Sequence, residues 1–229
     1  PMSARRQRQM CIRDRIICMD YMRTNMRAKS ILFIFIALFT LHIDAQFQQG
    51  RDYQRISSVI PIKKDGKVEV IEAFWYGCGA CFSFEPTLNR WKSSLDNDTK
   101  FSKLPVAWGP IHQLHAKLFY TIEALNLGNN GHSAVFNAIH KEGNYLTSDN
   151  AIVDFLGSLG VEEADVLKQM NSFSVKQKVK RSIELSKKLK VNGVPMMFVD
   201  GTFKVQAQRN HNDMLDIIDY LIKIQKPKS

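Results

Sequence analysis

The feature that most constrains the fold of this chain is a pair of cysteines separated by two small residues, Cys78-Gly79-Ala80-Cys81. Residues 68–75, directly before the pair, are β-branched and aromatic, which is typical of a buried strand. After the pair, apolar residues recur at helical spacing: Phe84, Leu88, Trp91 and Leu95. The cysteines are therefore predicted to lie at a strand-to-helix junction, with Cys78 near the helix N-terminus.

The spacing of Cys78 and Cys81 suits thiol chemistry, because one thiolate can attack a partner and the second can then resolve the mixed disulfide. A structural disulfide and a chance spacing are alternatives. A structural zinc site would need four ligands, and residues 46–229 contain no second cysteine pair. Helix N-termini favour anions, so Cys78 is predicted to attack, with a pKa below the ordinary value of about 8.5. Cys81, one turn into the helix, is predicted to be shielded and to resolve.

The first residues have the layout of an export signal. Basic residues Arg27 and Lys29 follow Met26, and the apolar stretch 31–41 leads to a small residue at Ala45. This stretch is shorter than the roughly 20 residues that a membrane-spanning helix needs, so a cleaved signal peptide over 26–45 is predicted; a retained anchor is the alternative. Residues 1–25 precede this signal and are predicted to be spurious upstream sequence.

The composition after residue 45 narrows the function classes. Residues 1–45 hold 8 of the 32 Lys and Arg and 3 of the 22 Asp and Glu, which leaves 24 against 19 and a net charge of +5 rather than +10. Binding to nucleic acid is therefore not predicted. Cys11 and Cys18 lie before residue 46, so Cys78 and Cys81 are the only thiols that remain and a scaffold stapled by several disulfides is excluded.

Further along the chain the patterns alternate between strand and helix. Residues 101–108 are predicted to be a strand, and 111–190 a block of several helices with turns at 128–131, 143–144 and 160. Residues 196–205 are predicted to be a hairpin with a type I′ turn at Asp200-Gly201, followed by a helix over 212–224. The order indicates an α/β domain with an inserted helical lobe.

A proline stands at the start of the hairpin, in Gly193-Val194-Pro195. A proline is accepted at the first residue of a strand, and its peptide bond there is predicted to be cis. The alternative is a trans proline that only ends the preceding helix.

Two segments resemble the periplasmic DsbA-like oxidases: Glu72 to Pro86 around the cysteines and Gly193 to Gly201 around the proline. The resemblance implies a thioredoxin fold with an inserted helical domain, divided here into 46–110, 111–190 and 191–229. It also implies a protein disulfide oxidoreductase, and no cofactor is predicted. Isomerases of this compartment resemble dimers joined by an added N-terminal domain, for which the 22 residues between Gln46 and the strand at Val68 leave no room, so a monomer is predicted. Such a protein donates disulfides to newly exported, unfolded proteins that contain cysteines, and a quinone-coupled membrane protein of the DsbB kind reoxidises it in the periplasm.

The resemblance assigns roles residue by residue. Cys78 matches the nucleophile, Cys81 the resolving thiol, and Pro195 the cis-proline that faces them. Val194 matches the residue whose backbone contacts substrate, and the dipeptide Gly79-Ala80 lies where substrate contacts are expected. Many oxidising members carry Pro-His at this dipeptide, so the strength of this chain as an oxidant is left open.

Three charged residues match a group beneath the active site. Glu72 matches a buried acid, Lys103 its basic partner, and Glu85 is a candidate for the same group. Because a buried charge near a thiol shifts its titration, the predicted role is proton handling. The alternative is an ordinary exposed ion pair at the strand end.

Other assignments are open at this stage. A reductase or isomerase and a non-catalytic chaperone or binding module are the alternative functions. Candidates for an apolar groove are Trp75, Tyr76, Met196 and Met197, and for Trp75 and Met197 a core position is an equal alternative. His112 and His115 are predicted to be partly exposed helix residues rather than metal ligands. The basic run 176–190 is predicted to be a solvated helix face.

Overall fold

The computed structural model describes residues 47–56, 66–206 and 210–226. The predicted upstream segment (1–25) and signal peptide (26–45) lie outside the described residues. Within the described part, no helix is long and apolar enough to cross a membrane.

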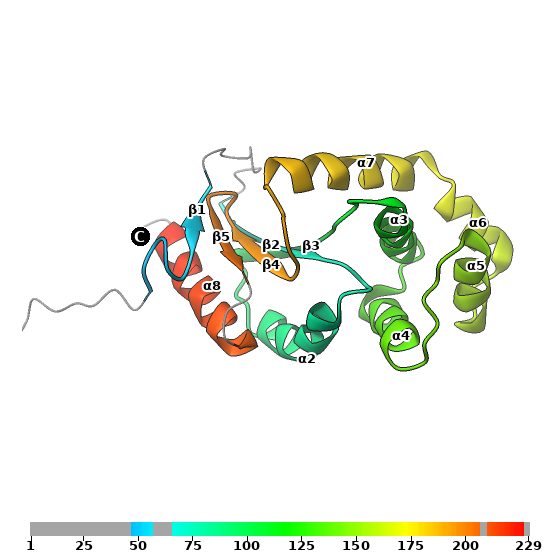
Figure 1. The fold of residues 1–229 in the computed structure, drawn as a ribbon, viewed down its shortest axis with the longest axis horizontal. Coiled ribbons are helices and arrows are strands. Elements are labelled where there is room, and N and C mark those ends of the chain that lie inside the picture. Colours follow the sequence, from blue (N-terminus) through cyan, green and yellow to red (C-terminus); the bar gives the residue numbers. More distant parts are fainter. Residues whose placement is uncertain (1–46, 57–65, 207–209, 227–229) are drawn as a thin grey trace, which may run out of the picture. The chain divides into compact units, whose positions relative to one another are not determined.

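Five strands form one mixed sheet in the order β1-β5-β4-β2-β3 (Figure 1). Strand β2 is parallel to β3 and antiparallel to β4, so it lies in the interior of the sheet. The described strands are β1 (Gln54–Arg55), β2 (Val68–Phe74), β3 (Thr99–Pro105), β4 (Met196–Val199) and β5 (Phe203–Gln206). The prediction missed β1, which is two exposed residues long and has no alternating pattern.

The predicted strand over 101–108 was shifted by two to three residues relative to β3. Strand β3 ends at Pro105 rather than at Trp108. The chain then leaves the sheet because Gly109 caps the next helix and Pro110 occupies its first turn, where a missing N–H costs nothing.

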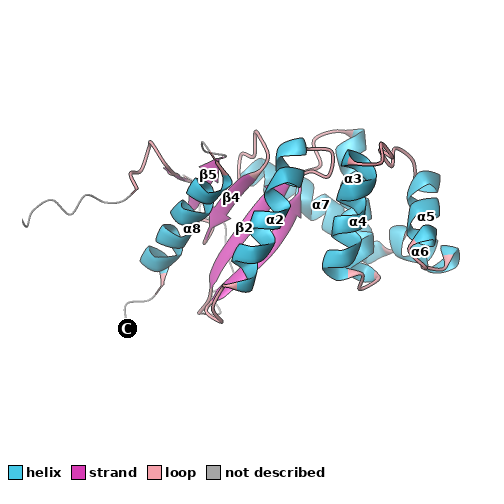
Figure 2. Ribbon diagram, turned by 90° about the horizontal axis from the view of Figure 1, so that it is seen from below, coloured by secondary structure: helices cyan, strands magenta, loops and turns pink. Residues whose placement is uncertain are grey.

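Seven helices are described, and along the chain five of them come after β3 and before β4. Figure 2 labels these helices. These five are α3 (Pro110–Ala124), α4 (Gly128–His140), α5 (Asp149–Ser158), α6 (Glu163–Met170) and α7 (Phe173–Lys188), and the other two are α2 (Gly79–Ser93) and α8 (His211–Gln225). The predicted turn at 128–131 was wrong, because α4 already begins at Gly128. The first turn of a helix tolerates such residues, since its N–H groups have no intrahelical partner.

The predicted hairpin turn is confirmed. Asp200 and Gly201 have φ angles of 49° and 54°, the positive values that a type I′ turn requires at both central residues. The Thr202 N–H donates to the Val199 carbonyl at 3.0 Å and closes the turn. The turn brings β5 back along β4, and the two strands pair antiparallel.

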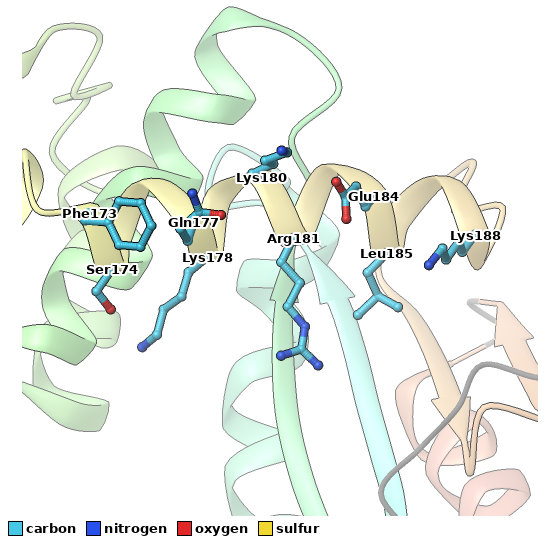
Figure 3. A pocket seen from close by; sticks show the side chains of 9 residues that line it. All are labelled: Phe173, Ser174, Gln177, Lys178, Lys180, Arg181, Glu184, Leu185 and Lys188. Carbon is cyan, nitrogen blue, oxygen red and sulfur yellow. The ribbon is translucent and has the colours of Figure 1, made fainter.

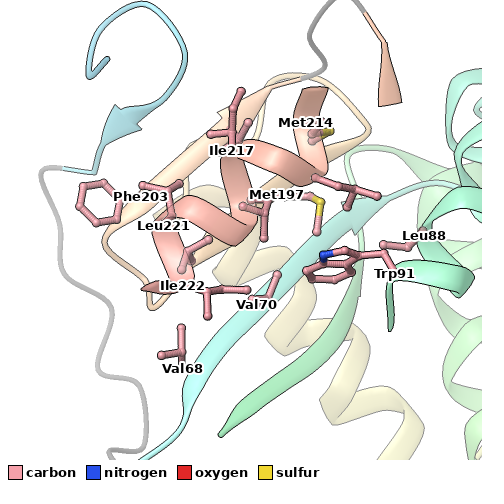
Figure 4. Close-up of a cluster of buried hydrophobic side chains, with 14 of the residues drawn as sticks. Val68, Val70, Leu88, Trp91, Met197, Phe203, Met214, Ile217, Leu221 and Ile222 are labelled. Atoms are coloured by element: carbon pink, nitrogen blue, oxygen red, sulfur yellow. The ribbon is translucent and has the colours of Figure 1, made fainter. Parts of the chain in front are cut away.

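Helices cover both faces of the sheet. Val68 and Val70 on β2 pack with Met197 on β4 against α2 and α8, as the close-up of this cluster shows (Figure 4). Side chains alternate along a strand, so Ile71 and Ala73 face the other side, where they pack with residues at the end of α7 and just after it. Full burial of each large apolar side chain contributes about 1.5–3 kcal/mol.

A second cluster joins the sheet to the inserted helices. Phe74 at the end of β2 and Cys81 on α2 pack with Phe119 on α3 and Phe136 on α4. The rings of Phe74 and Phe119 meet edge to face with centroids 5.4 Å apart. This packing fixes the inserted helices against the end of β2, the point where the cysteine pair begins.

Candidate active site

Cys78 caps the N-terminus of α2, as the sequence predicted. Its backbone is extended (φ −88°, ψ 114°), and its sulfur accepts a hydrogen bond from the Cys81 N–H at 3.3 Å. Both cysteines are free thiols in the structure. Cys78 is partly exposed, whereas Cys81 is buried beneath it. One sulfur is therefore accessible to a partner and the other is shielded.

The surroundings of the two thiols separate their pKa values. The pKa of Cys78 is lowered to about 6. The largest cause is hydrogen bonding from the Cys81 side chain, which burial of Cys78 opposes. Smaller lowering effects come from the N–H groups of Cys81 and Ala80 and from the charge of His140. Burial raises the pKa of Cys81, and its contacts with Cys78 raise it further. At neutral pH Cys78 is therefore a thiolate while Cys81 keeps its proton.

The proline loop lies against Cys78. The Val194-Pro195 peptide bond is cis, which confirms the sequence prediction. The Cys78 sulfur lies 3.4 Å from the Val194 carbonyl oxygen, to which it can donate only when it is protonated. Gly79 and Ala80 are exposed beside it, and a Cβ added to Gly79 would meet nothing within 4 Å. These residues border the accessible side of Cys78, where the sequence placed substrate contacts.

The three charged residues singled out in the sequence lie together below the cysteines. Parallel pairing sets Glu72 on β2 beside Lys103 on β3, and the Lys103 ammonium lies 2.6 Å from the Glu72 carboxylate. The same ammonium contacts the Glu85 carboxylate from α2. Glu72 is 0% exposed. The alternative of an ordinary exposed ion pair is therefore wrong.

This cluster holds one more carboxylate than ammonium group. Burial raises the pKa of Glu72; Lys103 lowers it and Glu85 raises it again, and the result is about 7. Burial lowers the pKa of Lys103, but the two carboxylates outweigh burial and raise it overall. A buried surplus charge is costly, so Glu72, the most buried member, holds a proton at pH values where a free carboxyl would have lost it. The Glu72 charge also contributes to the raised pKa of Cys81.

Comparison with known proteins identifies the family. Residues 85–218 match the DSBA-like thioredoxin domain. The thiol:disulfide interchange protein DsbA of Pseudomonas syringae pv. tomato is 39% identical over 177 residues, which are 76% of this chain and 83% of that protein. The chain belongs to the DsbA family.

Solved structures of DsbA proteins agree with this assignment. The crystal structure of Pseudomonas aeruginosa DsbA has a TM-score of 0.75 and 36% identity, over 78% of this chain and 94% of that one. DsbA from Xylella fastidiosa has a TM-score of 0.72 and 26% identity, over 76% and 95% of the two chains. This DsbA-family chain is thus a protein disulfide oxidoreductase with a thioredoxin fold and an inserted helical domain. The domain match begins at Glu85, after both cysteines.

Two sequence interpretations near the DsbA-family site were wrong. Tyr76 and Met196 do not line a groove, because both are buried in the core; Met197 is also buried, so its core alternative holds. His115 is not partly exposed: it is 3% exposed, accepts from the Trp75 indole N–H at 3.0 Å, and lies with its other ring nitrogen 3.1 Å from the Tyr145 carbonyl. The surrounding aromatic rings bury it, which helical spacing alone does not reveal.

The sequence also gave no reason to select His132 and His140, which the fold brings to the active site of this DsbA-family protein. Both lie on α4 of the inserted domain. His132 hydrogen-bonds the Tyr76 hydroxyl, and His140 Nε2 lies 2.7 Å from the Tyr76 carbonyl. Their spacing of eight residues, near two helical turns, was the one available signal.

The basic run lies on α7, and its lysines and arginine are exposed, as predicted for a solvated face. Figure 3 shows Lys178, Lys180, Arg181 and Lys188 around a surface hollow that Phe173 also lines. Lys178 lies 3.4 Å from Glu123 on α3.

Among the described residues, no group of three or more His, Cys, Asp or Glu is arranged to hold a metal ion.

The titration of Glu72 is expected to make folding depend on pH. Its pKa is about 7 in the folded protein and about 4.5 as a free group, so the folded state binds more protons between these values. The contribution of Glu72 to stability is therefore full below about pH 4.5 and is lost by about pH 7. Relative to wild type, Glu72→Gln should gain about 3 kcal/mol of unfolding free energy across this window. Urea unfolding of both reduced proteins at several pH values measures this difference, and parallel pH curves would contradict it.

Proposed function

We propose that this DsbA-family chain donates disulfides to newly exported proteins through Cys78 and Cys81. The observation that carries the proposal is the arrangement of an accessible low-pKa thiol over a buried high-pKa thiol. A stabilised Cys78 thiolate favours the reduced form of the pair, which makes the disulfide form a better oxidant. The direction of electron flow is therefore from substrate thiols to this protein.

The proposed reaction has two exchange steps. A substrate thiolate attacks the Cys78 sulfur of the Cys78–Cys81 disulfide, the disulfide bond breaks, and Cys81 leaves and takes up a proton. A second substrate thiolate then attacks the substrate sulfur of the mixed disulfide and releases Cys78 as a thiolate. The substrate gains a disulfide and loses two electrons, which the cysteine pair receives. A low pKa makes Cys78 a good leaving group in the second step.

Glu72, Lys103 and Glu85 support the first step in this proposal. Cys81 needs a proton as it leaves. The carboxyl group of Glu72 is buried, its pKa is raised to about 7, and its charge contributes to the raised pKa of Cys81. The proposed substrate contacts are the Val194 backbone, Pro195, and the exposed Gly79 and Ala80, because these border the accessible side of Cys78.

The cellular setting of the proposal rests on the predicted signal peptide over 26–45 and on the family resemblance. In this proposal the protein acts in the periplasm, as a monomer, on unfolded exported proteins that contain cysteines. A quinone-coupled membrane protein of the DsbB kind then reoxidises the Cys78–Cys81 pair. Disulfide exchange of this kind needs no bound cofactor, because the two sulfur atoms carry the electrons.

Redox equilibration with glutathione tests the proposed direction. An oxidase should have a reduction potential less negative than about −180 mV, the value typical of disulfide isomerases, and should form disulfides in a reduced, unfolded protein. A potential near −270 mV, together with rapid reduction of a disulfide substrate, would favour the reductase alternative. Slow alkylation of Cys78 at neutral pH would instead favour a non-catalytic chaperone.

The dipeptide between the cysteines gives a further prediction. Replacing Gly79 and Ala80 with Pro and His should lower the Cys78 pKa and raise the reduction potential together, because the imidazole adds a donor and a positive charge beside the thiolate. Gly79 is the first residue of α2, where proline is accepted, and Ala80 is exposed. Each unit of pKa change corresponds to about 30 mV in a two-electron couple.

Thiolate absorbance titrations of both proteins test this prediction, with Gly79→Pro alone as the control for backbone effects. An unchanged Cys78 pKa in the double variant would show that the dipeptide does not control the thiolate here.

A further inference from the structure

His140, the last residue of α4, contacts the cysteine segment from the inserted domain. Its Nε2 lies 2.7 Å from the Tyr76 carbonyl oxygen, two residues before Cys78. Its ring stacks on Phe82, the residue after Cys81, with centroids 4.7 Å apart and an interplanar angle of 7°. One imidazole thus touches the chain on both sides of the cysteine pair.

The hydrogen bond to Tyr76 is compatible with both charge states of the ring. A carbonyl oxygen only accepts, so Nε2 carries a hydrogen and donates it. A second proton would bind Nδ1, and the imidazolium can form without loss of this contact. Imidazole is also the side chain whose charge normally changes between pH 5 and 8.

The cysteine pair has no cation of its own, since Gly79 and Ala80 lack polar side chains. The Cys81 N–H on α2 donates a hydrogen bond to the Cys78 sulfur. The hydroxyl of Tyr76, which follows β2, is hydrogen-bonded to the His132 ring. On the inserted domain, the Lys141 ammonium lies 5.8 Å from the centre of the Phe82 ring, and the charge of His140 acts on Cys78 in the direction that lowers its pKa.

We propose that His140 is a positioning residue of the exchange site, which fastens the cysteine segment to α4 and, in its imidazolium form, favours the Cys78 thiolate. Through this residue the inserted domain contributes to the chemistry of the thioredoxin fold. The inference rests on the proposed function only in taking Cys78 as the thiol whose ionisation matters.

Two substitutions at position 140 separate charge from contact. His140→Phe keeps a ring against Phe82 but removes the donor and the charge, and His140→Gln keeps a neutral donor. Both should raise the Cys78 pKa by about half a unit to one unit, the effect of a nearby charge partly screened by solvent. The equilibrium constant with glutathione should shift about three- to tenfold toward a weaker oxidant.

The experiment measures thiolate absorbance of the reduced, full-length protein against pH. His211→Gln is the matched control, because His211 packs on Phe84 of the same helix at 4.9 Å and has no contact with the cysteine segment among those that the structure describes. Its Cys78 pKa should equal that of wild type.

An unchanged Cys78 pKa in folded His140→Gln protein would overturn the inference, and so would an equal shift in His211→Gln. If His140→Phe does not fold, His140→Gln alone decides. Exchange activity that survives Cys78→Ser would refute the proposed function but leave the titration result standing, so the two failures can be told apart.

Discussion

Cys78→Ser is expected to reduce disulfide exchange to the uncatalysed background, whereas Cys81→Ser is expected to accumulate stable mixed disulfides with substrate. The reason is that Cys78 is accessible at the N-terminus of α2 with a pKa of about 6, while Cys81 is buried and keeps its proton. Without Cys78 no sulfur is presented to a partner. Without Cys81 nothing within the protein resolves the adduct.

Electrophoresis without reducing agent, after incubation with a cysteine-containing unfolded protein, measures the adducts. The double variant Cys78→Ser/Cys81→Ser is the matched control and should form none. Stable adducts on Cys81 in the Cys78→Ser protein would reverse the proposed roles.

Lys103→Met is expected to cause the largest loss of stability, about 3–5 kcal/mol at pH 8. The substitution removes the only ammonium that contacts both Glu72 and Glu85 in the described structure. The Glu72 and Glu85 carboxylates would then lie close together without an ammonium in contact, and among the described residues only the charge of Lys92 would still act on them. The loss should shrink toward pH 5, because the raised pKa of Glu72 lets this carboxyl take up a proton there, which removes its uncompensated charge.

Urea unfolding at both pH values measures this effect. Lys100→Met, an exposed position on the same strand, is the control and should change stability by less than about 0.5 kcal/mol. Combining Lys103→Met with Glu72→Gln should recover part of the loss. An equal loss at pH 5 and pH 8 would contradict the electrostatic explanation and point to lost packing of the lysine stem.

Short-range sequence patterns were sufficient to predict most of the helices and strands of the fold. The β-branched and aromatic residues of β2, the helical spacing after Cys81 and the Asp200-Gly201 dipeptide each specify local structure, because they reflect conformational preferences over a few residues. The same logic placed Cys78 at a helix N-terminus. The strand–cysteine–helix junction was therefore readable from the sequence.

Resemblance to a family supplied what local patterns did not. It paired Glu72 with Lys103, and only the parallel register of β2 and β3 shows that they are direct neighbours. Neither the family resemblance nor the spacing of residues along the chain assigned a role to His140.

The sequence by itself determined the element types, the junction that carries the cysteines and the position of the proline before the hairpin. Only the tertiary structure decided that Tyr76, Met196 and Met197 are core, that Glu72 is completely buried, and that a histidine 64 positions beyond Tyr76 reaches its carbonyl. Local structure follows from the conformational preferences of neighbouring residues. Contacts between distant segments depend on how whole helices and strands pack, which is the sum of many weak interactions and cannot be assigned to any one stretch of sequence.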